Sequence, residues 1–136
     1  MGLFSKKVDY PELGDDSPVA EQINEVEGPL KTLMNQVSDP LEVIPADNQA
    51  YVFIGKPPKK FGVAVIEGGA VQSFVAAAKE KGLEPVKIQK LNEQFRDAYI
   101  QNQDAQRYKA SIAGKEIVVT PCAELAREVS QIMGSM

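Results

Sequence analysis

The chain has 136 residues, which is enough for one domain with a sizeable core and too few for two. Its hydrophobic fraction of 43% and charged fraction of 25% are typical of a folded globular domain. It contains no histidine, no tryptophan and one cysteine, Cys122. This inventory excludes the commonest general base and metal ligand, disulfide frameworks, and zinc sites built from several thiolates. We expect no cofactor and no metal, and the composition argues against an enzyme without deciding the question.

Charge is unevenly distributed along the chain. Residues 1–50 hold three lysines against ten acidic residues, a balance of −7, whereas residues 51–136 hold twelve basic and nine acidic residues, a balance of +3. The net charge of −4 argues against nucleic-acid binding, which normally uses a basic surface. An acidic leading segment beside a mildly basic body either packs within the molecule or serves as an arm for a partner protein.

Residues 1–16 are predicted to form a flexible leader, because proline, glycine and an acidic pair interrupt them and no apolar period is sustained. Their apolar part is too short for a secretory signal, and Lys6 stands where a myristoylation pattern has Ser or Thr. No stretch reaches the roughly 18 apolar residues that span a bilayer. We therefore expect a cytoplasmic protein without membrane insertion.

The first helical region begins at Ser17, a residue type that caps helix N-termini, followed by Pro18 at the first helical position. Pro29 removes a backbone donor and predicts a kink or two short helices, over 18–27 and 29–38. Apolar residues recur at helical spacing along one face: Val19, Ile23, Val26, Leu30, Leu33, Met34 and Val37.

The segment 39–45 is predicted as one more capped helical turn, which the proline at its end cuts off. Composition then changes. Residues 51–54 and 62–66 are short apolar runs, typical of strands buried on both faces. Only residues 55–61 separate them, which is too few for a parallel crossover, so the pair is predicted to be antiparallel.

The Glu67-Gly68-Gly69 turn is predicted to lead directly into an amphipathic helix that Gly82 caps. Alternating apolar and polar residues over 85–90 predict a half-exposed strand near an edge of the sheet. Residues 92–106 are predicted to form a polar helix whose buried seam includes Phe95. The inward side of the amphipathic helix is predicted to comprise Val71, Phe74, Val75 and Ala78.

Residues 108–112 and 116–120 are predicted to form a second hairpin. Thr120 is then expected to cap a final helix, with Pro121 in its first turn. The resulting order is α-β-β-α-β-α-β-β-α, an α/β (α+β) fold in which helices pack on a mixed, largely antiparallel five-stranded sheet.

The predicted organisation is a single domain with three parts. Residues 1–16 form the leader, residues 17–47 an acidic helical segment, and residues 48–136 an α/β core. Several apolar strands leave an open sheet edge possible, which makes a homodimer reasonable.

Two candidate sites sit beside helix starts. Cys122 is expected at about the second position of the last helix, where free backbone N–H groups and the helix dipole favour a thiolate. The alternative is a small buried hydrophobe. Gly68 and Gly69, between a strand and a predicted helix start, would offer bare amides to a phosphate. Their alternative role is turn geometry.

Two further groups are predicted to contact a partner protein. The loop carrying Lys56, Lys59 and Lys60 is most simply a solvated hairpin tip, and its best functional use would be docking on an acidic protein surface. The apolar face of the first helical region would lie in a partner's groove or cover the sheet of its own chain. Its members on the first helix are Val19, Ile23 and Val26.

The resulting functional prediction is a non-catalytic accessory or regulatory protein that acts through contacts with another protein or protein complex. An alternative is a small-molecule or anion-binding domain that uses the turn at Gly68 and Gly69. A third is thiol chemistry at Cys122.

Overall fold

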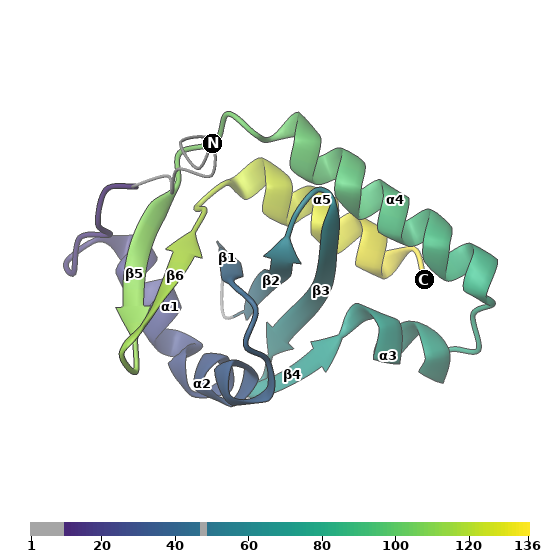
Figure 1. Ribbon diagram of the computed structural model, residues 1–136, viewed down its shortest axis with the longest axis horizontal. Coiled ribbons are helices and arrows are strands. Elements are labelled where there is room, and N and C mark those ends of the chain that lie inside the picture. Colours follow the sequence, from purple (N-terminus) through teal and green to yellow (C-terminus); the bar gives the residue numbers. More distant parts are fainter. Residues whose placement is uncertain (1–9, 47–48) are drawn as a thin grey trace, which may run out of the picture.

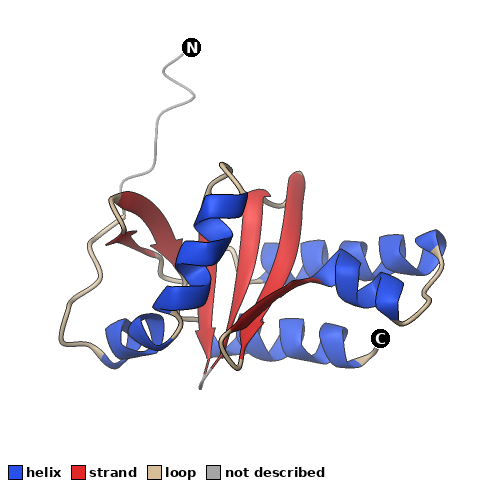
Figure 2. Ribbon diagram, turned by 90° about the horizontal axis from the view of Figure 1, so that it is seen from below, coloured by secondary structure: helices blue, strands red, loops and turns tan. Residues whose placement is uncertain are grey.

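A computed structural model of the chain describes residues 10–46 and 49–136. Its centre is a six-stranded mixed sheet in the order β4-β3-β2-β1-β6-β5, with helices on both faces (Figures 1 and 2). The predicted α+β class with a mixed sheet is confirmed, with six strands in place of five. The elements are α1 (Pro18–Glu25), α2 (Glu27–Gln36), β1 (Leu41–Ala46), β2 (Gln49–Lys56), β3 (Lys60–Glu67), β4 (Ala70–Ser73), α3 (Phe74–Glu80), α4 (Pro85–Gln101), β5 (Tyr108–Ile112), β6 (Lys115–Val119) and α5 (Ala123–Gly134).

Strand β1 joins two antiparallel blocks of the sheet. It pairs antiparallel with β2 and parallel with β6, in the register Val43↔Val119. Side chains of β1 and β2 alternate between two separate cores, so that Val43 and Val52 face one side while Ile44 and Phe53 face the other. Burial on both faces explains the continuous apolar run of residues 51–54 in β2.

One core, here called the aliphatic face, lies between the sheet and the helices α1 and α2. The two predicted short helices are confirmed, with their break at Val26. The Ser17 hydroxyl caps α1 by accepting from the Ala20 N–H at 3.1 Å. The predicted apolar stripe packs on the sheet in this core, so the first helical region covers its own sheet: Ile23, Val26, Leu30, Leu33 and Met34 are buried, and Val19 and Val37 are partly buried.

The other core, here called the aromatic face, lies between the sheet and α3, α4 and α5. Its rings pack closely, edge-on for Phe74–Phe95 with a centroid distance of 4.9 Å and tilted for Phe53–Tyr99 with one of 5.1 Å. Gly82 ends α3 as predicted, at a φ of +75°, and the Leu83 N–H donates to the Ala78 carbonyl.

The helical turn predicted for residues 39–45 is wrong, because residues 41–46 form the central strand β1. The local signal of an acidic residue followed by proline was overridden by burial on both faces of the sheet. Proline has no backbone N–H to donate to a neighbouring strand. Pro45 is tolerated in β1 because the pairing of β1 with β6 ends at Val43, so that no hydrogen bond to β6 is required at residue 45.

The strand predicted over 85–90 is also wrong, since these residues form the first turns of α4. Pro85 occupies the first helical position, and the buried or partly buried series Ile88, Leu91, Phe95 and Ala98 has helical spacing. Val86, which completed the apparent alternation, is 63% exposed.

The segment after Gly69 is not the start of a helix either. Gly68 and Gly69, at φ of +61° and +80°, form the two-residue turn of a hairpin in which Glu67 pairs with Ala70. The short strand β4 follows, and α3 begins four residues later than predicted, at Phe74. Val75, predicted to face inward, is 44% exposed.

Candidate functional site

The largest cleft described lies where the chain before α1, α1 itself and strand β5 meet. Its volume is about 540 Å³, within the range typical of ligand sites. Three segments build it, two neighbouring ones at residues 12–15 and 20–27 and a third, far along the chain, at residues 109–116. Its polar lining comprises Glu12, Asp15, Asn24, Glu27, Lys109, Ser111 and Glu116.

Pairing of the leader with β5 forms one end of this cleft. The Lys109 N–H donates to the Pro11 carbonyl at 2.9 Å, and the Leu13 N–H donates to the Lys109 carbonyl at 2.9 Å. The chain then leaves the sheet at Gly14, whose carbonyl accepts from the Ser17 hydroxyl at 2.9 Å. Residues 11–13 therefore form a short addition to the sheet edge, and the turn into α1 forms the outer rim of the cleft.

The cleft is acidic. Four carboxylates line it, from Glu12, Asp15, Glu27 and Glu116, against the single ammonium of Lys109. Glu27 also pairs with Lys31 at 3.2 Å, with both side chains about half exposed, and such a solvated pair contributes little stability. The balance of charge in the cleft favours a cationic group.

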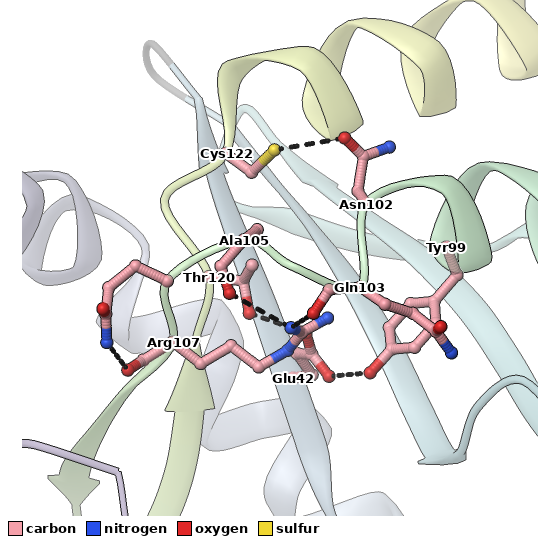
Figure 3. A network of polar contacts seen from close by, with 9 residues as sticks. Glu42, Tyr99, Asn102, Gln103, Ala105, Arg107, Thr120 and Cys122 are labelled. Carbon is pink, nitrogen blue, oxygen red and sulfur yellow. Dashed lines mark hydrogen bonds and ion pairs between the residues drawn. The ribbon is translucent and has the colours of Figure 1, made fainter.

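A second polar cluster is buried on the aromatic face (Figure 3). The Glu42 carboxylate accepts from the Tyr99 hydroxyl at 2.7 Å, from the Arg107 Nε at 2.9 Å and from the Thr120 hydroxyl at 2.6 Å. Arg107 Nη1 donates to the Gln103 and Ala105 carbonyls. No buried side-chain nitrogen or oxygen of the described residues lacks a partner. This saturated network holds α4, β1 and β6 together and offers no open position to a substrate.

The network shifts two protonation equilibria. Burial, then the hydrogen bond to Glu42 and its charge, raise the pKa of the Tyr99 hydroxyl far above its ordinary value. Burial, the largest single effect, would lower the pKa of Arg107, but the attraction and hydrogen bonding of Glu42 and Tyr99 together outweigh it and raise that pKa. The tyrosine is therefore held protonated and the arginine charged, which is the pattern of a structural network.

Cys122 lies at the N-cap of α5, and Thr120 does not, contrary to prediction. The Cys122 sulfur accepts from the Leu125 N–H at 3.4 Å, and its thiol lies 3.5 Å from the Asn102 side-chain oxygen. Thr120 is fully buried and donates to Glu42 instead. The half-buried thiol therefore caps the helix, and chemistry at this sulfur stays a prediction.

Gly68 and Gly69 lie in the β3–β4 turn and not at a helix N-terminus. The anion site predicted there required helical amides directly after the glycines. Ser73, four residues on, caps α3 by accepting from the Ala76 N–H at 3.0 Å. The predicted site therefore loses its geometric basis.

Lys56, Lys59 and Lys60 are exposed at the tip of the β2–β3 hairpin. The loop is tied to α4, because Arg96 Nε donates to the Pro58 carbonyl at 2.8 Å. The three ammonium groups are thus presented from an anchored loop, and docking of this loop on a partner stays a prediction.

Two of the three helix residues predicted to bind a partner are in the core. Ile23 and Val26 are each 4% exposed and pack on the aliphatic face, together with the partly buried Val19. A partner could contact Ile23 and Val26 only if α1 dissociated from the sheet. Their visible role is to hold α1 beside the cleft.

The described part of the chain offers no group of three or more His, Cys, Asp or Glu side chains that fits a metal ion. Within the same residues no helix is both long and apolar enough to cross a membrane. Comparisons with protein-family models, curated proteins and solved structures find no match for the chain.

Sequence reasoning did not predict the cleft, because its three segments meet only in the folded chain. The available signal was the acidic excess of residues 1–50, to which Glu12, Asp15 and Glu27 belong. The buried network was missed as well. Its signal was a glutamate and an arginine next to apolar strands.

Proposed function

We propose that this protein is a non-catalytic accessory module that binds a cationic segment of another protein in its acidic cleft. The observation that carries the proposal is the charge of the cleft lining, with four carboxylates and one ammonium around a volume of about 540 Å³. A lysine- or arginine-bearing segment complements that charge, and such complementarity favours rapid and selective association.

The chemistry of the chain supports binding over catalysis. There is no histidine to act as a general base. The buried Glu42 network has its polar atoms satisfied by the protein itself. The acidic groups of the cleft lie at an open rim, where their charge would attract a cationic partner.

The test compares two variants of equal net charge. Glu12→Lys with Asp15→Lys reverses two exposed carboxylates of the cleft, whereas Glu67→Lys with Glu93→Lys reverses two exposed carboxylates elsewhere. Removing residues 1–47 would be uninformative, because it deletes the central strand β1. The probe is a random 12-residue peptide library displayed on phage and selected on the wild-type protein.

We expect the selected peptides to be rich in lysine and arginine. Their affinity, measured by fluorescence anisotropy at low salt, should fall at least tenfold in the cleft variant and less than twofold in the control, and it should weaken as salt rises. Selection of no cationic peptide, or equal losses in both variants, would show that the cleft is not the binding site.

A further inference from the structure

The sheet edge beside the acidic cleft is only partly covered. Strand β5 is the last strand of the sheet, and the chain segment 11–13 runs parallel to it, with Glu12 opposite Lys109. At Gly14 the chain turns away, while β5 continues through Ser111 to the turn at Ala113 and Gly114. The added strand therefore stops two residues before β5 does.

The register identifies which backbone groups are left at this edge. Residues 112 and 115 flank a two-residue turn and so form a hydrogen-bonded pair, as do residues 110 and 117. Along β5, Lys109 and Ser111 alternate with these hydrogen-bonded residues, so their backbone N–H and C=O groups point away from β6. Lys109 uses both groups to bond residues 11 and 13. Ser111, which is exposed, presents the same two groups to the cleft.

We infer that the cationic segment binds as an extended strand, which adds to β5 at Ser111 and continues the short strand formed by residues 11–13. This inference rests on the proposed function and specifies its mode of recognition. Strand addition supplies backbone hydrogen bonds, and the alternating side chains of the added strand supply specificity. One occupant is favoured, an extended lysine- or arginine-bearing segment of a partner protein.

Charge on both sides of the edge supports that occupant. Ser111 lies opposite Glu116 in the hairpin, so that this carboxylate flanks one side of the open position. Glu27 at the start of α2 and Asp15 in the turn before α1 line the rest of the cleft. Alternate side chains of an added strand point to opposite faces of the sheet, so its basic residues on the side of α1 would face the carboxylates of Asp15 and Glu27.

The first experiment methylates the backbone nitrogens of the tightest-binding selected peptide, one position at a time, with wild-type protein. We expect methylation to lower affinity at least tenfold at one position and less than twofold at the others, since Ser111 offers a single outward carbonyl to the amides of the added strand. Hydrogen exchange at the Ser111 amide should slow at least tenfold when the peptide saturates the protein.

A variant pair tests the same bond from the other side. Ser111→Pro removes the outward N–H at an edge position where proline is tolerated, and Ser111→Ala keeps it. We expect a tenfold loss for the proline variant alone, with circular dichroism confirming that both variants are folded.

The outcomes separate the two proposals. Uniform tolerance of N-methylation, with an unprotected Ser111 amide and binding still lost in the Glu12→Lys, Asp15→Lys variant, would overturn strand addition and leave charge recognition by the cleft intact. Binding that survives in that charge variant would overturn both.

Discussion

The two faces of the sheet are built from different side chains. The aromatic face holds Phe53, Phe74 and Phe95, which are buried and in ring contact with one another or with Phe61 and Tyr99. Such pairs add stabilisation beyond the area they bury. The Glu42 network closes this face at one end and ties α4 to the sheet through Tyr99.

The aliphatic face contains no ring among its described core residues and is bordered by clefts. The acidic cleft lies on one side of the β5–β6 hairpin, and a groove of about 380 Å³ between α2 and β6 lies on the other. Figure 2 shows α1 and α2 on the side of the sheet opposite α4 and α5. The comparison indicates that ring contacts and a buried polar network connect the aromatic face, whereas the aliphatic face is joined by aliphatic side chains and borders the last strand of the sheet, β5.

The substitution expected to lower the free energy of unfolding most through the aromatic face is Glu42→Ala. The substitution leaves Arg107, 8% exposed, without its counter-ion, together with two buried hydroxyls. Breaking one side of a buried ion pair costs about 3–5 kcal/mol of the free energy of unfolding. Urea denaturation followed by circular dichroism measures that loss.

A matched change on the aliphatic side is Glu27→Ala, which removes the exposed partner of Lys31. We expect a loss of less than about 1 kcal/mol. A Glu42→Leu, Arg107→Met double variant removes both charges and should recover much of the single-variant loss. Equal losses for Glu42→Ala and Glu27→Ala would contradict the contrast between the two faces.

Core truncations sharpen the same contrast. Phe95→Ala, at a fully buried position, should cost about 3–5 kcal/mol, because the cavity is closed on all sides. Ile23→Ala should cost about 2 kcal/mol, the lower end for such a change, since Ile23 lines the acidic cleft and the space left behind joins it. Thermal and urea unfolding of both variants measure the difference, and a costlier Ile23→Ala would place the tighter packing on the aliphatic face.

Local signals predicted the elements that depend on neighbours in sequence. The Ser17 cap, the Gly82 helix end and both hairpin pairs were predicted correctly, because each rests on a short-range backbone requirement. The errors at 39–45 and 85–90 arose where burial in the folded chain decided the outcome. Leu41 to Pro45 are buried between two layers, which no capping signal reports.

The candidate site was less accessible to sequence reasoning than the fold. The cleft and the Ser111 edge depend on pairing between residues 11–13 and β5, about 100 positions apart along the chain. Nothing local to either segment encodes that pairing. The acidic excess of the leading segment left open packing within the molecule or an arm for a partner protein, whereas the proposed place of binding could be inferred only from the register of β5.

Tyr99→Phe tests whether the hydrogen bond from the Tyr99 hydroxyl to Glu42 stabilises the aromatic face in addition to side-chain packing. The raised pKa of Tyr99 means that the folded state keeps its proton above pH 10, where the unfolded chain has lost it. Its stabilising contribution is therefore complete below pH 10 and declines as pH rises, by about 1.4 kcal/mol per pH unit. The advantage of wild type over Tyr99→Phe, about 1 kcal/mol at pH 7 from the hydrogen bond to Glu42, should shrink and then reverse between pH 10 and about 11.5. Urea unfolding of both proteins across that interval measures it, and a constant difference would mean that the pKa of Tyr99 is the same in the folded and unfolded states.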